Sequence, residues 1–203
     1  MKRTKSINLD RMRKVSRQLH LAPLGVAFAS MTLAGCSDSR KAVVYTNVDQ
    51  CTAENPELEQ ECRAAYEDAL AKAEKTAPKY RSMRDCESDF GSHTCVNNQT
   101  SQSSSIFMPA MAGFMFARAL DHNRYDNNPV FTSNAYRSPL YGHWVSSDGY
   151  RYGSNRSRKV EVGSDAFKPK PKVTRTMSRG GFGSTVAAKS SWGGSKSRGG
   201  WGG

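Results

Sequence analysis

Cysteine is the residue type in this chain whose spacing most clearly predicts chemistry, and the first cysteine ends the run Leu33-Ala34-Gly35-Cys36. This run has the form of a lipobox, in which the cysteine thiol is acylated and becomes the first residue of the mature chain. A basic segment with seven Lys/Arg and one acid in residues 1–35, and an apolar stretch over residues 21–34, precede the cysteine. As a helix the stretch is about 21 Å long, too short to span a bilayer comfortably.

We therefore predict a lipoprotein signal peptide over residues 1–35 and lipidation at Cys36. The alternatives are a secretory signal with a chance cysteine and an uncleaved N-terminal anchor in the inner membrane. Several acyl chains on one residue bury enough methylenes for stable membrane anchoring. The expected location is the cell envelope, facing the periplasm. Ser37, rather than an aspartate, favours the outer membrane, with inner-membrane retention as the alternative.

The other four cysteines, Cys51, Cys62, Cys86 and Cys95, form an even set, which suits two disulfides in an oxidising compartment. Three pairings are open. Cys51–Cys62 and Cys86–Cys95 are favoured because each closes a short local loop. Zinc or thiol-redox chemistry is disfavoured because neither spacing is CxxC and only His93 lies nearby in sequence. No metal site, cofactor or catalytic residue is predicted.

The fold class expected is a small α+β protein, beginning with an acidic, disulfide-stapled and mainly helical domain over residues 36–95. Asn55 with Pro56 is typical of a helix start, and Ser82 and Gly91 are typical of helix ends. The expected elements are a strand over residues 42–47, a helix over 56–75 and a helix over 83–90.

A polar linker is expected over residues 96–105, followed by a Met- and Phe-rich apolar helix over residues 106–120. That helix is either buried or docked on the domain, or it lies on the membrane or in a partner groove, where flexible Met side chains suit an adaptable contact. The residues proposed for such a contact are Phe107, Met108, Met111, Phe114, Met115 and Phe116.

Residues 121–160 are expected to carry an aromatic β-hairpin that turns at Asp148-Gly149. The isolated His122 and His143 are interpreted as packing residues. Residues 161–203 are expected to be a basic low-complexity tail, polyproline-like over residues 168–172 and disordered over the Gly/Ser-rich residues 179–203.

Charge is unevenly distributed along the chain. Residues 36–99 hold eight Lys/Arg and twelve Asp/Glu, whereas residues 100–203 hold fifteen Lys/Arg and five acids. A basic tail in the envelope would meet an anionic envelope polymer or an acidic envelope protein, or it would have no partner. Export argues against nucleic acid, although Arg-Gly-Gly with aromatic residues would favour it in a cytosolic protein.

Several motifs occur in the order Cys51, Asn55-Pro56, Cys62, Thr76-Ala77-Pro78-Lys79-Tyr80, Asp85-Cys86, Phe90-Gly91, Cys95, Phe107-Met108-Pro109 and Arg179-Gly180-Gly181-Phe182-Gly183. With the lipobox, they resemble the YgiB-like family of uncharacterised proteobacterial proteins, described as lipoproteins or membrane-associated. The resemblance implies no catalytic residues. Family genes often lie beside those of glutathionylspermidine-synthase-like proteins. The expected function is therefore a non-catalytic envelope lipoprotein, with an accessory subunit or enzyme of an envelope or polyamine-thiol pathway as the alternative.

Overall fold

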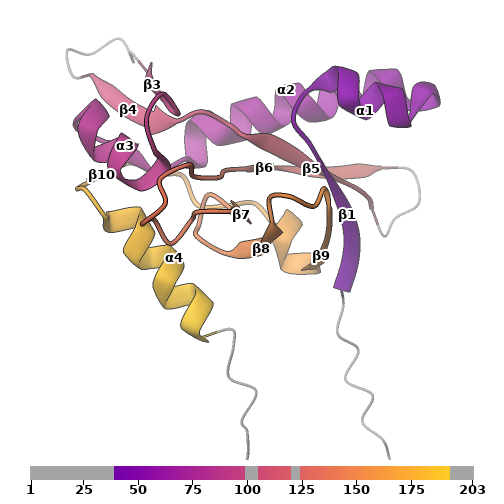
Figure 1. The fold of residues 1–203 in the computed structure, drawn as a ribbon. Coiled ribbons are helices and arrows are strands. Elements are labelled where there is room, and N and C mark those ends of the chain that lie inside the picture. Colours follow the sequence, from indigo (N-terminus) through magenta and orange to yellow (C-terminus); the bar gives the residue numbers. More distant parts are fainter. Residues whose placement is uncertain (1–38, 99–104, 120–123, 193–203) are drawn as a thin grey trace, which may run out of the picture. The chain divides into compact units, whose positions relative to one another are not determined.

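The fold is known from a computed structural model, which describes residues 39–98, 105–119 and 124–192 (Figure 1). These residues belong to one compact unit of the chain. The signal peptide over residues 1–35, lipidation at Cys36 and the sorting residue Ser37 lie outside the described residues. The same holds for most of the expected linker, for His122 and for residues 193–203.

One of two four-stranded sheets in the described residues is antiparallel and has the longer strands, β6 (Tyr125–Val130), β5 (Gly113–Arg118), β1 (Ser39–Tyr45) and β9 (Lys159–Gly163), in that order. Helices α1 (Val48–Glu54) and α2 (Glu59–Thr76), with the short 3-10 turn η2 (Pro56–Leu58) between them, cover one face (Figure 1). The hairpin of β7 (His143–Val145) and β8 (Arg151–Ser154) and the 3-10 turn η3 (Ser164–Phe167) pack against the other face.

Side chains alternate between the two faces of this sheet. Tyr45 and Phe114 pack with Ala65 and Ala69 of α2. Val44 and Met115, their neighbours in sequence, pack with the hairpin and η3. Because successive residues of a strand point to opposite faces, a central strand covered on both sides is apolar at nearly every position.

The second sheet is small and has the order β10 (Thr176–Met177), β2 (Lys79–Tyr80), β4 (Ile106–Pro109) and β3 (Cys95–Asn98). Helices α3 (Met83–Phe90) and α4 (Gly181–Trp192) pack beside it. Tyr80, Phe90, Phe131 and Phe182 lie together in its core, each with 2 % exposure or less.

Several expectations from the sequence are confirmed. Helix α3 spans the predicted residues, and the Ser82 hydroxyl accepts a hydrogen bond from the Asp85 amide. The disulfides are Cys51–Cys62 and Cys86–Cys95, as favoured. The hairpin turns at Gly149, which has a φ of +92°. Helix α1 was not predicted; Asn47 caps it by accepting from the Gln50 amide at 2.8 Å.

The prediction of an apolar helix over residues 106–120 is wrong. The first part of this segment is strand β4 and its second part is strand β5, and the two strands belong to different sheets. The chain crosses between the sheets before Gly113, where a Cβ atom would lie 2.6 Å from the carbonyl oxygen of Tyr45. A short apolar run looks the same in a doubly covered strand and in a buried helix, so periodicity could not distinguish them.

Two expected boundaries also differ from the structure. Strand β1 pairs with β5 and β9, so residues 36–95 do not form a separate domain. The expected low-complexity tail over residues 161–203 is folded as far as residue 192, because it contains the end of β9, η3, β10 and α4. The disorder expected over residues 179–203 is wrong for α4, which spans Gly181–Trp192. Val162, Ala166, Phe182 and Val186 from this stretch are buried, which supplies core contacts that its composition does not suggest.

Candidate functional site: two cavities beside a basic strap

Residues 168–172, Lys-Pro-Lys-Pro-Lys, form what we call the basic strap, which connects η3 to the chain before β10. At Lys168 the backbone has φ −63° and ψ 146°, the polyproline geometry expected from the sequence. The strap is held at its centre and just beyond its end. Lys170 Nζ lies 3.3 Å from Asp148 Oδ2 and 3.2 Å from the Asp165 carbonyl oxygen, and the Val173 amide donates to the Lys75 carbonyl at 2.9 Å.

The larger of two cavities beside the strap has a volume of about 500 Å³. The tip of the β7–β8 hairpin, β9 and η3 form its other walls. Its charges are of both signs and are partly paired: Asp148 accepts from Ser146 Oγ at 2.6 Å and from Lys170, and Lys189 Nζ lies 3.7 Å away. The ring of Tyr150 lies under Lys189, with the ammonium 4.0 Å from its centroid.

Tyr152 also lines the larger cavity, and its hydroxyl is buried without a hydrogen-bond partner among the described residues. Burial raises the pKa of this phenol, against the smaller opposing effect of the nearby Ser146 hydroxyl. Tyr152 is therefore neutral at any physiological pH.

The smaller cavity, about 200 Å³, adjoins the strap on its α2 side. Helix α2, strand β6 and η3 supply its other walls. The residues that line it are Lys72, Lys75, Thr76, Asn128, Phe167, Pro169, Lys170 and Lys172. Four of these eight residues are lysines and none is acidic, so the cavity has a positive electrostatic potential.

The four lysines differ in how far they are already paired. Lys72 Nζ lies 2.8 Å from Asp68 Oδ2, 2.8 Å from the Asn127 carbonyl oxygen and 3.2 Å from Asn127 Oδ1. Partial burial raises the pKa of Asp68, but the hydrogen bond and charge of Lys72 outweigh it and lower this pKa overall. Lys170 has two acceptors, described above. The side chains of Lys75 and Lys172 are exposed and make no hydrogen bond or ion pair with any residue that the structure describes.

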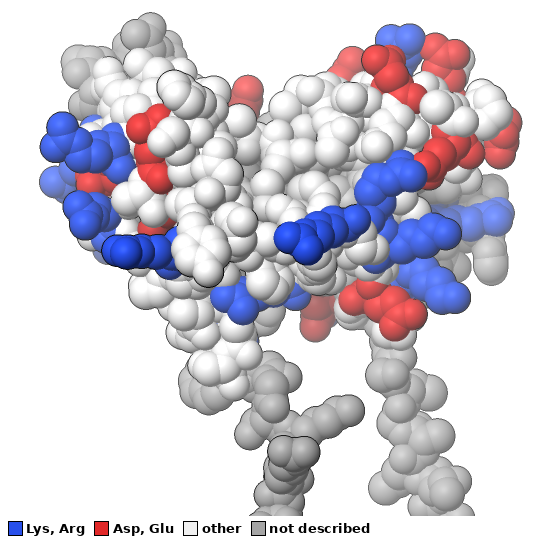
Figure 2. All heavy atoms as spheres, in the orientation of Figure 1, with Lys and Arg blue, Asp and Glu red and all other residues white. Residues whose placement is uncertain are grey.

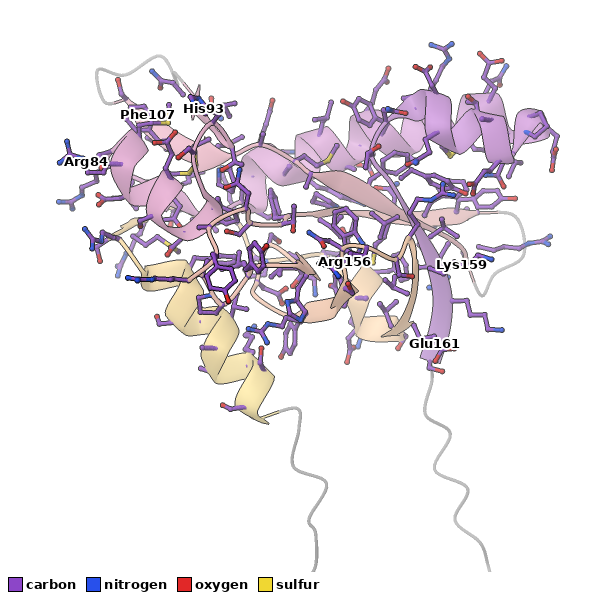
Figure 3. All side chains as sticks on the ribbon, in the orientation of Figure 1. Arg84, His93, Phe107, Arg156, Lys159 and Glu161 are labelled. Atoms are coloured by element: carbon purple, nitrogen blue, oxygen red, sulfur yellow. A yellow bond between two sulfur atoms is a disulfide. The ribbon has the colours of Figure 1, made fainter. Side chains whose placement is uncertain are left out.

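The six residues proposed for membrane or partner contact do not form a surface. Met108, Phe114, Met115 and Phe116 are buried, with exposures of 8 %, 0 %, 0 % and 6 %. Phe107 and Met111 are half-buried against the cores. Figure 3 shows Phe107 on β4, at the small sheet. Four of these six predicted contacts are therefore wrong, because the segment is made of strands that form the core.

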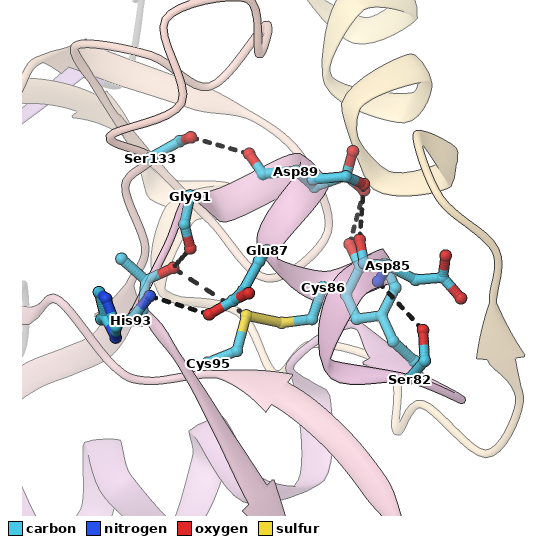
Figure 4. Close-up of a disulfide and its surroundings, with 12 residues drawn as sticks. Ser82, Asp85, Cys86, Glu87, Asp89, Gly91, His93, Cys95 and Ser133 are labelled. Carbon is cyan, nitrogen blue, oxygen red and sulfur yellow. Dashed lines mark hydrogen bonds between the residues drawn. A yellow bond between two sulfur atoms is a disulfide. The ribbon is translucent and has the colours of Figure 1, made fainter.

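The second disulfide fixes the turn between α3 and β3 (Figure 4). His93, in this turn, has a positive φ of 62°, and its amide donates to Glu87 Oε1 at 2.9 Å. His143 is on β7, so these two histidines, which are far apart in the sequence, also lie on different elements of the fold. Among the described residues no group of three or more His, Cys, Asp or Glu side chains could hold a metal ion, and no helix is long and apolar enough to cross a membrane.

Sequence reasoning missed the lysines of the smaller cavity. Lys72 and Lys75 are three residues apart, so they share a face of α2. The Lys-Pro repeat predicts an extended segment, but the contact between the two segments depends on tertiary packing. The sequence alone therefore carries no signal that these four lysines line one cavity.

Known sequences show which family contains this chain. The family model described as "Protein of unknown function (DUF1190)" matches residues 39–193, the stretch from β1 to α4. A UPF0441 protein of Serratia proteamaculans is 39 % identical, covering 94 % of this chain and 93 % of that protein. A UPF0441 protein of Sodalis glossinidius is 41 % identical, with 92 % of each chain covered. No solved structure matches the chain. The chain belongs to the DUF1190 family, and an uncharacterised family was what its motifs predicted.

Proposed function

We propose that this protein is a non-catalytic envelope lipoprotein that binds an anionic envelope polymer through the basic surface of its C-terminal third. Lipid on Cys36 anchors it, the domain faces the periplasm, and Ser37 favours the outer membrane. The lipobox supports the anchor. The Cys51–Cys62 and Cys86–Cys95 disulfides support an oxidising compartment, because such bonds persist mainly outside the cytosol.

The observation that carries the proposal is the segregation of charge on a folded scaffold. Residues 48–76, which include α1 and α2, hold eight acids and three Lys/Arg, whereas residues 151–192 hold ten Lys/Arg and two acids. Figure 2 shows acidic side chains gathered where α1 lies, and basic side chains with a few acids among them along the opposite side and the lower front. Figure 3 places Arg84 of α3 on the opposite side and Glu161 at the lower front. Arg156 and Lys159 lie on that front in Figure 3. A polyanion that meets an ordered row of cations loses less of its binding energy to side-chain ordering.

The two charged side chains that are buried among the described residues, Arg40 and Asp89, hold parts of the fold together, which supports the non-catalytic part of the proposal. Arg40 is 9 % exposed, and its Nη1 lies 2.7 Å from Asp126 Oδ2. Asp89 is 3 % exposed and accepts from the Tyr80 hydroxyl at 2.7 Å. Both pairs join different elements of the fold. Each therefore has a structural role that requires no substrate.

The anchor is tested by labelling cells with radioactive palmitate and isolating the protein. The wild type and a Cys51→Ser/Cys62→Ser variant should retain the label, because neither cysteine is acylated. The Cys36→Ser variant should lose it. Label retained by the Cys36→Ser protein would refute the anchor.

Polymer binding is tested by cosedimentation of the full-length protein, in detergent, with purified lipopolysaccharide. Arg156→Gln and Lys159→Gln should each weaken binding, and binding should weaken as salt rises. Arg63→Gln is the matched control, because Arg63 is exposed on α2 and pairs only with Glu59 of its own helix among the described residues. Equal effects of all three substitutions would argue against a basic binding surface.

A further inference from the structure

The smaller cavity has a charge and shape that match a definite class of ligand. We propose that it binds a phosphate monoester dianion between Lys75 and Lys172, with a third hydrogen bond from Lys170. This inference rests on the proposed function and deepens it by naming a phosphoryl group as the chemistry recognised. The phosphate could belong to a lipid headgroup or to a soluble molecule.

The charge balance of the cavity indicates a dianion. Lys72 pairs with Asp68 at 2.8 Å. Lys170 pairs with Asp148 at 3.3 Å, and this carboxylate also lies 3.7 Å from Lys189, so it balances the charge of Lys170 only in part. Lys75 and Lys172 form no ion pair with the described residues; Lys75 acts on Asp68 only by its charge, and Lys72 already pairs with that carboxylate, so at least two positive charges are left at one cavity. A phosphate monoester carries about −1.5 to −2 charges at pH 7, whereas a single carboxylate would leave one lysine unpaired.

The hydrogen-bond donors of the cavity indicate where the phosphate oxygens bind. An ammonium group has three N–H donors. The three acceptors around Lys72 occupy all of its donors, so Lys72 contributes only its electric field. Lys170 uses two donors and retains one. Lys75 and Lys172 retain all of theirs, so seven N–H groups remain for the three terminal oxygens of a phosphate monoester.

The walls of the cavity favour an organic phosphate over a bare ion. Phe167 and Pro169 provide apolar surface beside the lysines. A volume of about 200 Å³ is several times the roughly 30 Å³ that one water molecule occupies in the liquid. The phosphoryl group therefore leaves room for an attached carbon chain against these two side chains.

The site is also held in place before a ligand binds. The Val173 amide donates to the Lys75 carbonyl, which ties the end of the basic strap to α2. Lys170 fixes the centre of the strap to the β7–β8 hairpin through Asp148. Lys172 lies between these two attachments. The backbone distance between Lys75 and Lys172 is therefore set by the fold, which lowers the entropic cost of binding.

The test is a calorimetric titration of the full-length protein, in a zwitterionic detergent at constant ionic strength, with two probes. The first probe is inorganic phosphate and the second is short-chain phosphatidic acid, with short-chain phosphatidylcholine as the control lipid that lacks a monoester. Saturable binding of either phosphate probe is expected. Binding of both, with equal affinity, indicates a soluble phosphate ligand; tighter binding of phosphatidic acid indicates a lipid headgroup.

The variant Lys75→Gln/Lys172→Gln should weaken the bound probe at least tenfold, because hydrogen bonds to charged groups are lost. Lys41→Gln/Arg84→Gln removes the same charge from exposed positions on β1 and α3 and should change the affinity less than twofold. No saturable binding of either probe, or equal weakening in the two double variants, would overturn the proposal. Absence of palmitate label from the wild-type protein would refute the lipid anchor and would leave the phosphate site untouched. Failure of the anchor and failure of the phosphate site are therefore distinguishable.

Discussion

Substitution of Asp89 by alanine should destabilise the fold by detaching α4. The Asp89 side chain is buried under the N-terminus of α4, where Oδ2 accepts from the Tyr80 hydroxyl at 2.7 Å and from the Phe182 amide at 3.3 Å. Alanine leaves both donors buried without an acceptor. Each unsatisfied buried donor costs about 1–3 kcal/mol, and release of the carboxylate from its buried site offsets part of this cost. We expect the free energy of unfolding to fall by about 3 kcal/mol.

The assay is urea unfolding of the full-length protein with both disulfides intact, combined with hydrogen exchange of the α4 amides. Asp89→Ala should lower the transition midpoint and remove exchange protection first from α4. Asp85→Ala is the matched control, since Asp85 lies on the same helix, in its half-buried first turn. It should cost less than about 1 kcal/mol, the usual value of a charge at a helix N-terminus.

A double-mutant cycle gives the refutation. Tyr80→Phe removes the hydroxyl and keeps the ring, which stacks edge-on with Phe90. If the hydrogen bond contributes as argued, Tyr80→Phe and Asp89→Ala should be coupled by about 1 kcal/mol or more. Additive effects, or a loss in Asp89→Ala no larger than in Asp85→Ala, would show that the buried carboxylate does not hold α4.

Three further changes have expected outcomes. Cys86→Ser/Cys95→Ser should lower the free energy of unfolding by about 2–3 kcal/mol, measured by urea unfolding, from the chain entropy of a loop closed over 9 residues. Gly113→Ala should cost about 1–3 kcal/mol in the same assay, because the new Cβ would lie 2.6 Å from the Tyr45 carbonyl oxygen, whereas Gly163→Ala meets open space and should cost less. Burial raises the pKa of Tyr80 and of Tyr152 well above the value of about 10 for an unfolded chain. Above pH 10 the unfolded chain loses these protons and the folded protein keeps them, so the contribution of the two tyrosines to stability should be constant below pH 10 and fall by about 1.4 kcal/mol per pH unit for each tyrosine above it. Urea unfolding at pH 9–11 should show a smaller slope for Tyr152→Phe.

Local signals in the sequence were sufficient for the elements that short-range chemistry determines. The Ser82 cap and Gly91 end of α3 depend on residues within one helical turn, and both disulfides close loops of 11 residues or fewer. The hairpin depends on the turn around Gly149. None of these features requires knowledge of what packs against the segment.

Strand β5 is covered on both faces by other parts of the fold, and the sequence of the segment alone does not show this. This explains why a helix was predicted over residues 106–120. Phe114, Met115 and Phe116 are consecutive, so no amphipathic pattern shows which face each occupies. Only the pairing of β5 with β1 places Phe114 under α2 and Met115 under the hairpin. The lysines of the smaller cavity are hidden for the same reason, because α2 and the basic strap are about 100 residues apart in the chain.

The C-terminal region shows how few apolar residues can order a segment of low-complexity composition. Phe182 and Val186 are four residues apart, so they lie on one face of α4, and both are almost completely buried. Phe182 stacks on Phe90 with ring centroids 5.5 Å apart, and its amide is the one bonded to Asp89. The other described residues of α4 are mostly small and exposed, so they make the segment polar in composition without removing these contacts. Composition averages over a segment, whereas stability depends on a few positions. The Arg-Gly-Gly-Phe-Gly motif therefore contains the residue that attaches α4 to the core, Phe182. The glycine at position 183 leaves room for the Asp89 carboxylate, because a Cβ atom there would lie 3.3 Å from Asp89 Oδ1.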